Sequence, residues 1–102
     1  MARDNFKYEL SKIADNDLEE IFDFTIWKFG FEQGVSYLQL IEEVIVLLAQ
    51  QPNMGKQRNE LKEGLLSYPV ESHIIFYQIL PNRIRIVRIL HGSRDLPRFF
   101  LK

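Results

Sequence analysis

The chain has 102 residues, 46% of them hydrophobic and 13% aromatic, which suffices for one core but not for two. We therefore expect residues 1-102 to form a single domain. Cysteine is absent and His73 and His91 are isolated, so the sequence predicts no disulfide, no metal site and no other cofactor. No apolar run is long enough to span a bilayer, and the first residues are polar. We expect a cytoplasmic protein without membrane contact.

The two signs of charge are segregated along the chain. Up to Gly55 there are four basic against ten acidic residues, and from Lys56 onward nine basic against four acidic. A dipolar surface of this kind suits an acidic partner or nucleic acid phosphates. A pair of ordinary solvated surfaces explains the same split.

The first half of the chain predicts a strand and two helices. Alternation of Phe6, Tyr8 and Leu10 favours a strand within residues 6-13, and the group Ala14 to Asp17 offers N-caps for a helix. The apolar face of this first helix is made of Leu18, Ile21, Phe22, Thr25, Ile26 and Phe29. Gly30 ends it, and a second helix is predicted from Glu32 to Gln50, stopped by Pro52. The short connection predicts an antiparallel helical hairpin.

The second half predicts three strands. A polar loop over residues 51-63 leads to a short apolar segment, 65-68, that Pro69 closes. Strands follow at 72-80 and 83-90, joined by a turn at Pro81-Asn82, and these two should form the centre of the sheet. Asp95 and Pro97 suit a final short turn. The sum is an α+β domain: an N-terminal strand, then an antiparallel helical hairpin packed on an antiparallel sheet with three C-terminal strands.

Several short motifs occur in the order found in one known family. They are Tyr8-Glu9-Leu10-Ser11, Asp17-Leu18, Thr25 to Gly30, Pro52-x-x-Gly55-x-x-Arg58-x-Glu60-Leu61, Gly64-Leu65, His73 to Tyr77, and Ile86 to His91 followed by Asp95. With these motifs the chain resembles the RelE/ParE toxin superfamily, and most of all the ParE toxins of type II toxin-antitoxin systems. The resemblance implies the RelE/ParE fold, inhibition of DNA gyrase without enzymatic activity, and neutralisation by a ParD-like antitoxin in a hetero-oligomer.

The RelE branch offers an alternative function, ribosome-dependent cleavage of messenger RNA. That chemistry needs cations that hold a phosphate and an acid that protonates the leaving oxygen. Arg58 and Arg88 are candidates for the first task. The family's acid is a Tyr or His near the C-terminus, whereas this chain ends Arg98-Phe99-Phe100-Leu101-Lys102, which leaves His91 as the candidate. A toxin homologue that has lost its activity and persists in an antitoxin complex is a third possibility.

The candidate target-binding residues come from the loop, the last strand and the chain end: Arg58, Arg88, His91, Arg94, Phe99 and Phe100. Each has a structural alternative. Arg88 could form an ion pair with Glu60 or Glu63 because strict alternation groups it with Ile84, Ile86 and Leu90. Arg58 could tie down its loop, and Phe99 and Phe100 could dock on the core. Arg83 and Arg85, with Arg94 and Arg98, predict a basic patch, from which alone we expect no sequence-specific nucleic acid binding.

The antitoxin-binding surface is predicted on the exposed side of the two helices. Tyr37, Leu40 and Leu47 make this side more apolar than full solvation requires. An antitoxin segment that crosses the hairpin and the sheet would bury them. A homodimer would bury the same side chains.

Overall fold

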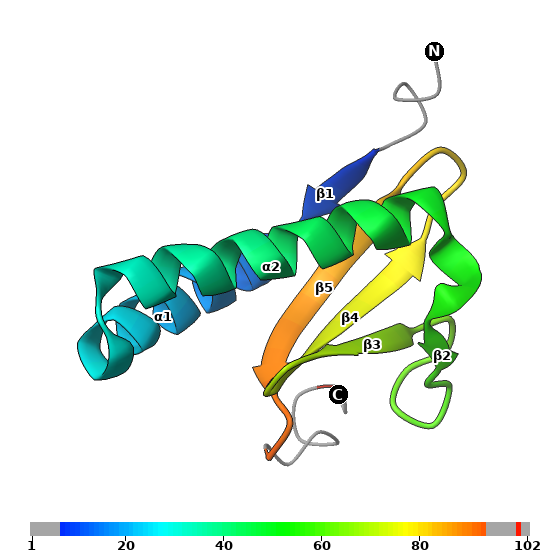
Figure 1. Cartoon of the computed structure of the whole chain (residues 1–102). Helices are drawn as coiled ribbons and strands as arrows, with labels where there is room; N and C mark the ends of the chain where they lie inside the picture. The colour runs from blue at the N-terminus through cyan, green and yellow to red at the C-terminus, as the bar shows by residue number, and fades with distance from the viewer. Residues whose placement is uncertain (1–6, 94–99, 101–102) are drawn as a thin grey trace.

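The computed structural model describes residues 7–93 and Phe100, and it places two helices on one face of a five-stranded sheet (Figure 1). The elements are β1 (Tyr8–Leu10), α1 (Lys12–Phe29), α2 (Phe31–Gln50), the 3-10 turn η2 (Pro52–Met54), β2 (Lys56–Gln57), β3 (Leu66–Val70), β4 (His73–Ile79) and β5 (Ile84–His91). The predicted α+β class, with its first strand, helical hairpin and three C-terminal strands, is confirmed.

The sheet is mixed, not wholly antiparallel as predicted. Its strand order is β1-β5-β4-β3-β2. Neighbours from β2 to β5 are antiparallel, whereas β1 runs parallel to β5, with Tyr8 beside Ile84 and Leu10 beside Ile86. Alternation along one strand identifies its faces but carries no information about its neighbour, so the direction of β1 was not visible in the sequence.

Helix α1 begins earlier than predicted, because Ser11 is its N-cap. The Ser11 hydroxyl accepts a hydrogen bond from the Ala14 N–H at 2.9 Å and donates one to the carbonyl of Val87 at 2.9 Å. The group predicted to supply the N-cap, residues 14-17, lies inside the helix, and Ala14 and Asp17 are buried there. The second bond of Ser11 joins the helix start to β5, and this tertiary contact favours Ser11 over the later polar residues.

The hairpin forms at Gly30, as predicted. Gly30 has a φ of 100°, a backbone conformation that favours glycine, and its N–H donates to the carbonyl of Ile26 at 2.8 Å. A second glycine, Gly34, brings the helices close together. A Cβ at Gly34 would lie only 2.7 Å from Cγ1 of Ile26.

The main core lies between the helices and the sheet and includes Ile41, Ile45, Leu48, Ile75, Ile84 and Ile86. The prediction that Phe29 belongs to the apolar face of the first helix was wrong. Phe29 is 62% exposed because the end of the hairpin extends beyond the sheet, which leaves no layer for it to pack against (Figure 1).

A second cluster covers the opposite face of the sheet. It consists of Leu61, Leu65, Phe76, Leu90 and Phe100. Phe100 is 9% exposed and its ring centroid lies 4.9 Å from that of Phe76. Of the two predicted fates for this residue, docking on the core is the one observed.

The loop before this cluster is held by Tyr77, whose side chain is fully buried. The Tyr77 hydroxyl donates to the carbonyl of Pro52 at 2.6 Å and accepts from the N–H of Gly55 at 2.9 Å. A Cβ at Gly55 would lie 2.3 Å from this hydroxyl. Glycine is therefore needed here for close approach.

A β-bulge in β5 corrects the predicted faces of that strand. The pairing shifts between Phe76 and Tyr77, which lie opposite Arg88 and Ile86 respectively. As a result Ile89, not Leu90, joins Ile84 and Ile86 in the helix-side core, while Leu90 packs on the other face. Simple alternation fails at one inserted residue.

Pro69 lies inside β3 and does not close the segment as predicted. It sits opposite Ile74 of β4. On the other side of β3, β2 pairs only with Leu66 and Ser67. Proline is tolerated here because its missing N–H faces an edge without a strand partner among the described residues.

Candidate functional site

The centre of the candidate site is an ion pair between α1 and β5. Arg88 donates two hydrogen bonds to the carboxylate of Asp17, both at 2.9 Å, and the same carboxylate accepts the backbone N–H of Ile89 at 3.0 Å. These bonds to Asp17 raise the pKa of Arg88. The predicted ion pair exists, but the predicted partners Glu60 and Glu63 were wrong. The bulge places Arg88 within reach of α1 instead.

Arg88 opens onto a groove of about 490 Å³, here called the β5 groove. It brings together two of the predicted site residues, Arg88 and His91. The other residues that line it are Asp17, Glu20, Ile21, Phe24, His73, Ile89, Leu90 and Ser93. The two carboxylates, from Asp17 and Glu20, make the groove mixed in charge.

His91 is exposed and is oriented by its neighbours. Its Nδ1 accepts the backbone N–H of Ser93 at 3.1 Å and lies 2.8 Å from the Ser93 hydroxyl. Its ring meets that of His73 edge to face, at a centroid distance of 5.3 Å. The Nδ1 of His73 lies 2.7 Å from the Tyr37 hydroxyl. The two histidines are isolated in the sequence, and only the pairing of β4 with β5 brings His73 opposite His91.

Arg58 lies on the opposite face of the sheet and does not line the β5 groove. Its Nε donates to Glu60 at 2.7 Å, its Nη1 donates to the Ser67 hydroxyl at 3.2 Å, and its guanidinium sits 5.9 Å from the centre of the Phe76 ring. These contacts tie the loop to β3 and β4. The hydrogen bond from Arg58 also lowers the pKa of Glu60.

The predicted basic patch is partly neutralised. Arg83 donates to the carboxylate of Glu9 on β1 at 2.6 Å, and Arg85 donates to its other oxygen. The two hydrogen bonds lower the pKa of Glu9. Arg94, Arg98 and Phe99, together with the predicted final turn at Asp95 and Pro97, lie outside the described residues.

The three predicted antitoxin-binding residues fall on two surfaces. Tyr37 and Leu40 are half-buried and line a groove of about 620 Å³, the hairpin groove, between the helices and the turn before β4. Leu47 is 38% exposed and lies elsewhere on α2. Tyr37 and Leu40 therefore point partly toward the sheet.

Sequence reasoning missed a group of exposed aromatic side chains at the end of the hairpin. Phe24, Trp27, Phe29 and Phe31 are 54%, 79%, 62% and 65% exposed. The signal was present, since Phe24 and Trp27 fall outside the apolar stripe of α1. Exposed aromatic groups of this size mark contact surfaces.

Over residues 7–93 and Phe100, no three His, Cys, Asp or Glu side chains come together as a possible metal site. None of the helices in this part of the chain has the length and apolarity needed to cross a membrane.

The fold and these surfaces define a small α+β domain in which a helical hairpin covers one face of a mixed sheet and opens grooves beside it. A family model described as "ParE toxin of type II toxin-antitoxin system, parDE" matches residues 8–96. The chain belongs to this family of ParE toxins.

Comparison with individual proteins gives the same family. Toxin ParE1 of Caulobacter vibrioides is 33% identical over 86% of this chain and 91% of its own length. Toxin ParE1 of Mycobacterium tuberculosis is 33% identical over 90% of this chain and 95% of its own length. A solved structure described as the chromosomal ParDE TA system from P. aeruginosa has a TM-score of 0.74 at 24% identity, covering 84% of this chain and 95% of that one. It shares the fold.

Proposed function

We propose that this protein is a cytoplasmic toxin that inhibits DNA gyrase without catalysis and is neutralised by a ParD-like antitoxin. The observation that carries the proposal is membership of the ParE toxin family across residues 8–96. Inhibition by binding requires a fixed contact surface and no acid, base or nucleophile. The domain supplies such surfaces in the β5 groove and at the exposed end of the hairpin.

The ion pairs favour this function over messenger RNA cleavage. A nuclease needs cations that are available to a phosphate. Here Arg88 is held by Asp17 and Arg58 by Glu60, and the carboxylate of Glu20 also lines the β5 groove. A phosphate entering the β5 groove would meet negative charge beside Arg88, and one that approached Arg58 on the opposite face would meet Glu60. One observation supports the nuclease as second candidate, namely that Arg88 and His91 share the β5 groove.

The target-binding set remains Arg58, Arg88, His91, Arg94, Phe99 and Phe100. Among its described members, Arg88 and His91 contribute to the β5 groove. Arg58 and Phe100 both pack against Phe76 on the opposite face. We propose that Arg88 and His91 contact gyrase directly. Arg58 and Phe100 stabilise the face of the sheet that lies opposite the helices.

The antitoxin is proposed to cover the hairpin groove through Tyr37 and Leu40 and to extend over Leu47. The family model that matches this chain is described as a toxin of type II toxin-antitoxin systems, which supports an antitoxin as partner. An antitoxin segment lying across the hairpin would remove this apolar surface from water, which favours binding at about 25 cal/mol per Å² of apolar area.

Two assays on one preparation test the function. Purified gyrase is given relaxed plasmid with and without the toxin, and ribosome-bound messenger is incubated beside it. We expect loss of supercoiling with trapped cleaved DNA, intact messenger, and recovery when antitoxin is added. Codon-positioned cuts that disappear in His91→Ala, with gyrase unaffected, would instead make the protein a nuclease.

A further inference from the structure

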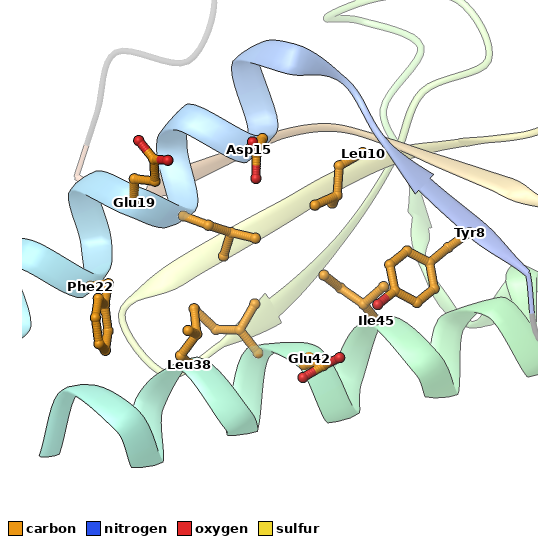
Figure 2. A pocket seen from close by; sticks show the side chains of 10 residues that line it. Tyr8, Leu10, Asp15, Glu19, Phe22, Leu38, Glu42 and Ile45 are labelled. Carbon is orange, nitrogen blue, oxygen red and sulfur yellow. The ribbon is translucent and has the colours of Figure 1, made fainter. Parts of the chain in front are cut away.

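A third groove, on the other side of α2, has no role in the surfaces described so far. It has a volume of about 290 Å³ and lies between β1, α1 and α2. Figure 2 shows Leu10, Leu38 and Ile45 pointing toward one another at its base. We call it the acidic groove because of the residues at its rim.

The rim carries three carboxylates. Asp15 and Glu19 lie one turn apart on α1, and Glu42 lies on α2 near Tyr8 (Figure 2). All three are exposed, and no described residue that lines the groove is basic. The groove thus combines an apolar base with a rim whose charged side chains are all negative.

The contact between Tyr8 and Glu42 shows that this charge is felt inside the groove. Burial raises the pKa of Tyr8, and the charge of Glu42 and a hydrogen bond to it raise the pKa further. Both residues line the groove. A ligand that enters beside Tyr8 therefore encounters a low-polarity surface under a negative potential.

Such a surface selects its occupant by charge. An anionic or purely apolar segment would leave the three carboxylates uncompensated and partly desolvated. A segment with an apolar side chain flanked by Lys or Arg would fill the base and neutralise the rim at once. The acidic first half of the chain, with ten acidic against four basic residues up to Gly55, strengthens the preference for a basic partner.

We propose that the acidic groove binds a basic amphipathic segment of the antitoxin, which inserts one large apolar side chain between Leu10, Leu38 and Ile45. This proposal rests on the proposed function for the existence of the antitoxin. The hairpin groove and the acidic groove are separated by α2, because Tyr37 and Leu40 line one while Leu38 and Glu42 line the other. An antitoxin that crosses α2 occupies both.

Charge reversal tests the proposal. The dissociation constant for the antitoxin encoded beside this chain is measured by calorimetry for wild type, Glu19→Lys and Glu42→Lys. The matched control is Glu43→Lys, since Glu43 is exposed on α2 next to Glu42 but does not line the groove. We expect the Glu19 and Glu42 variants each to bind about tenfold more weakly than the control, and wild-type binding to weaken with salt more steeply than theirs.

Each other result has a distinct meaning. If all three variants lose affinity equally, or none does, antitoxin binds but not through the acidic groove, and the proposal is overturned while the proposed function stands. If wild type does not bind antitoxin at all, the neutralisation part of the proposed function fails as well. Sedimentation of the toxin alone tests whether a second copy of the chain fills the acidic groove. A dimer that dissociates in Glu19→Lys but not in Glu43→Lys would assign the groove to this second copy and overturn the proposal.

Discussion

Arg88 is the residue on which the arrangement of α1 and β5 depends most directly. Its side chain is 19% exposed and that of Asp17 is 9% exposed, so both charges are largely removed from water. Pairing them restores little net energy relative to an apolar pair, but removal of Asp17 takes away both of its hydrogen bonds to Arg88 and the carboxylate that compensates a largely buried guanidinium. The backbone N–H of Ile89 would also lose its acceptor.

Replacing Asp17 by alanine should therefore lower the free energy of unfolding by about 3 kcal/mol. Urea denaturation measures the change. Asp23→Ala, which removes an exposed carboxylate on the same helix, serves as the control and should stay within about 0.5 kcal/mol of wild type. The double variant Asp17→Leu with Arg88→Met should recover part of the loss, and failure to recover would show that the N–H of Ile89 dominates.

The sequence allowed half of this ion pair to be foreseen. An arginine in an apolar strand must find an acceptor, and the prediction that Arg88 forms an ion pair was confirmed. The sequence does not identify its partner, because Asp17 lies 71 residues earlier in a segment whose polar residues are typical of helix caps. Local patterns report the face on which a residue lies, whereas the identity of a long-range partner depends on how elements pair.

At the level of elements, the two helices, the turn at Gly30 and the pairing of β4 with β5 followed from apolar spacing and turn residues. The parallel pairing of β1 and the short β2 did not, because edge strands of two or three residues carry too little pattern. Of the site, the sequence indicated Arg88 and His91 as neighbours. The acidic groove was not foreseen, since it needs three elements in place.

The attachment of β1 to β5 should depend on pH. Hydrogen bonds from Arg83 and Arg85 lower the pKa of Glu9 below its ordinary 4.5, so their stabilising effect is complete above that value. It is lost as the pH falls through the lowered pKa in the folded protein. We expect the melting temperature of wild type to drop over this acid range more than that of Glu9→Gln.

The control for this titration is Glu43→Gln, on the exposed face of α2. It should retain the wild-type slope of melting temperature against pH. A residual slope in Glu9→Gln is expected from Glu60, whose pKa is lowered by Arg58. Identical slopes for wild type and Glu9→Gln would show that the ion pairs at β1 add nothing to folding.

At the scale of the whole molecule, the sheet is covered on both faces by different means. Two helices cover one face, and a loop together with Phe100 covers the other. The second cover is thin, because among the described residues only Leu61, Leu65 and Phe100 pack from outside the sheet onto Phe76 and Leu90. The tail residue Phe100 should accordingly matter more for stability than its position in the chain suggests.

Phe100→Ala should reduce the free energy of unfolding by about 3 kcal/mol, since it empties a site against the Phe76 ring. Chemical denaturation provides the measurement. Phe24→Ala is the matched control: the same side chain is lost from a position that is 54% exposed, so the change should remain small. Equal effects of the two variants would mean that Phe100 is not packed in solution.

The bulge in β5 also limits how the family can change in length. Removing the unpaired residue Val87 would leave Arg88 opposite Phe76 and Ile86 opposite Tyr77, so pairing would become regular and Ile89 and Leu90 would keep their present faces. Deleting a paired residue of β5 would instead move its neighbours to the opposite faces of the sheet. An insertion in the loop before β3 carries no such penalty. Gaps in alignments of related chains are thus expected in that loop and at the bulge, and excluded from the paired positions of the last strand, even where the residues of β5 themselves vary.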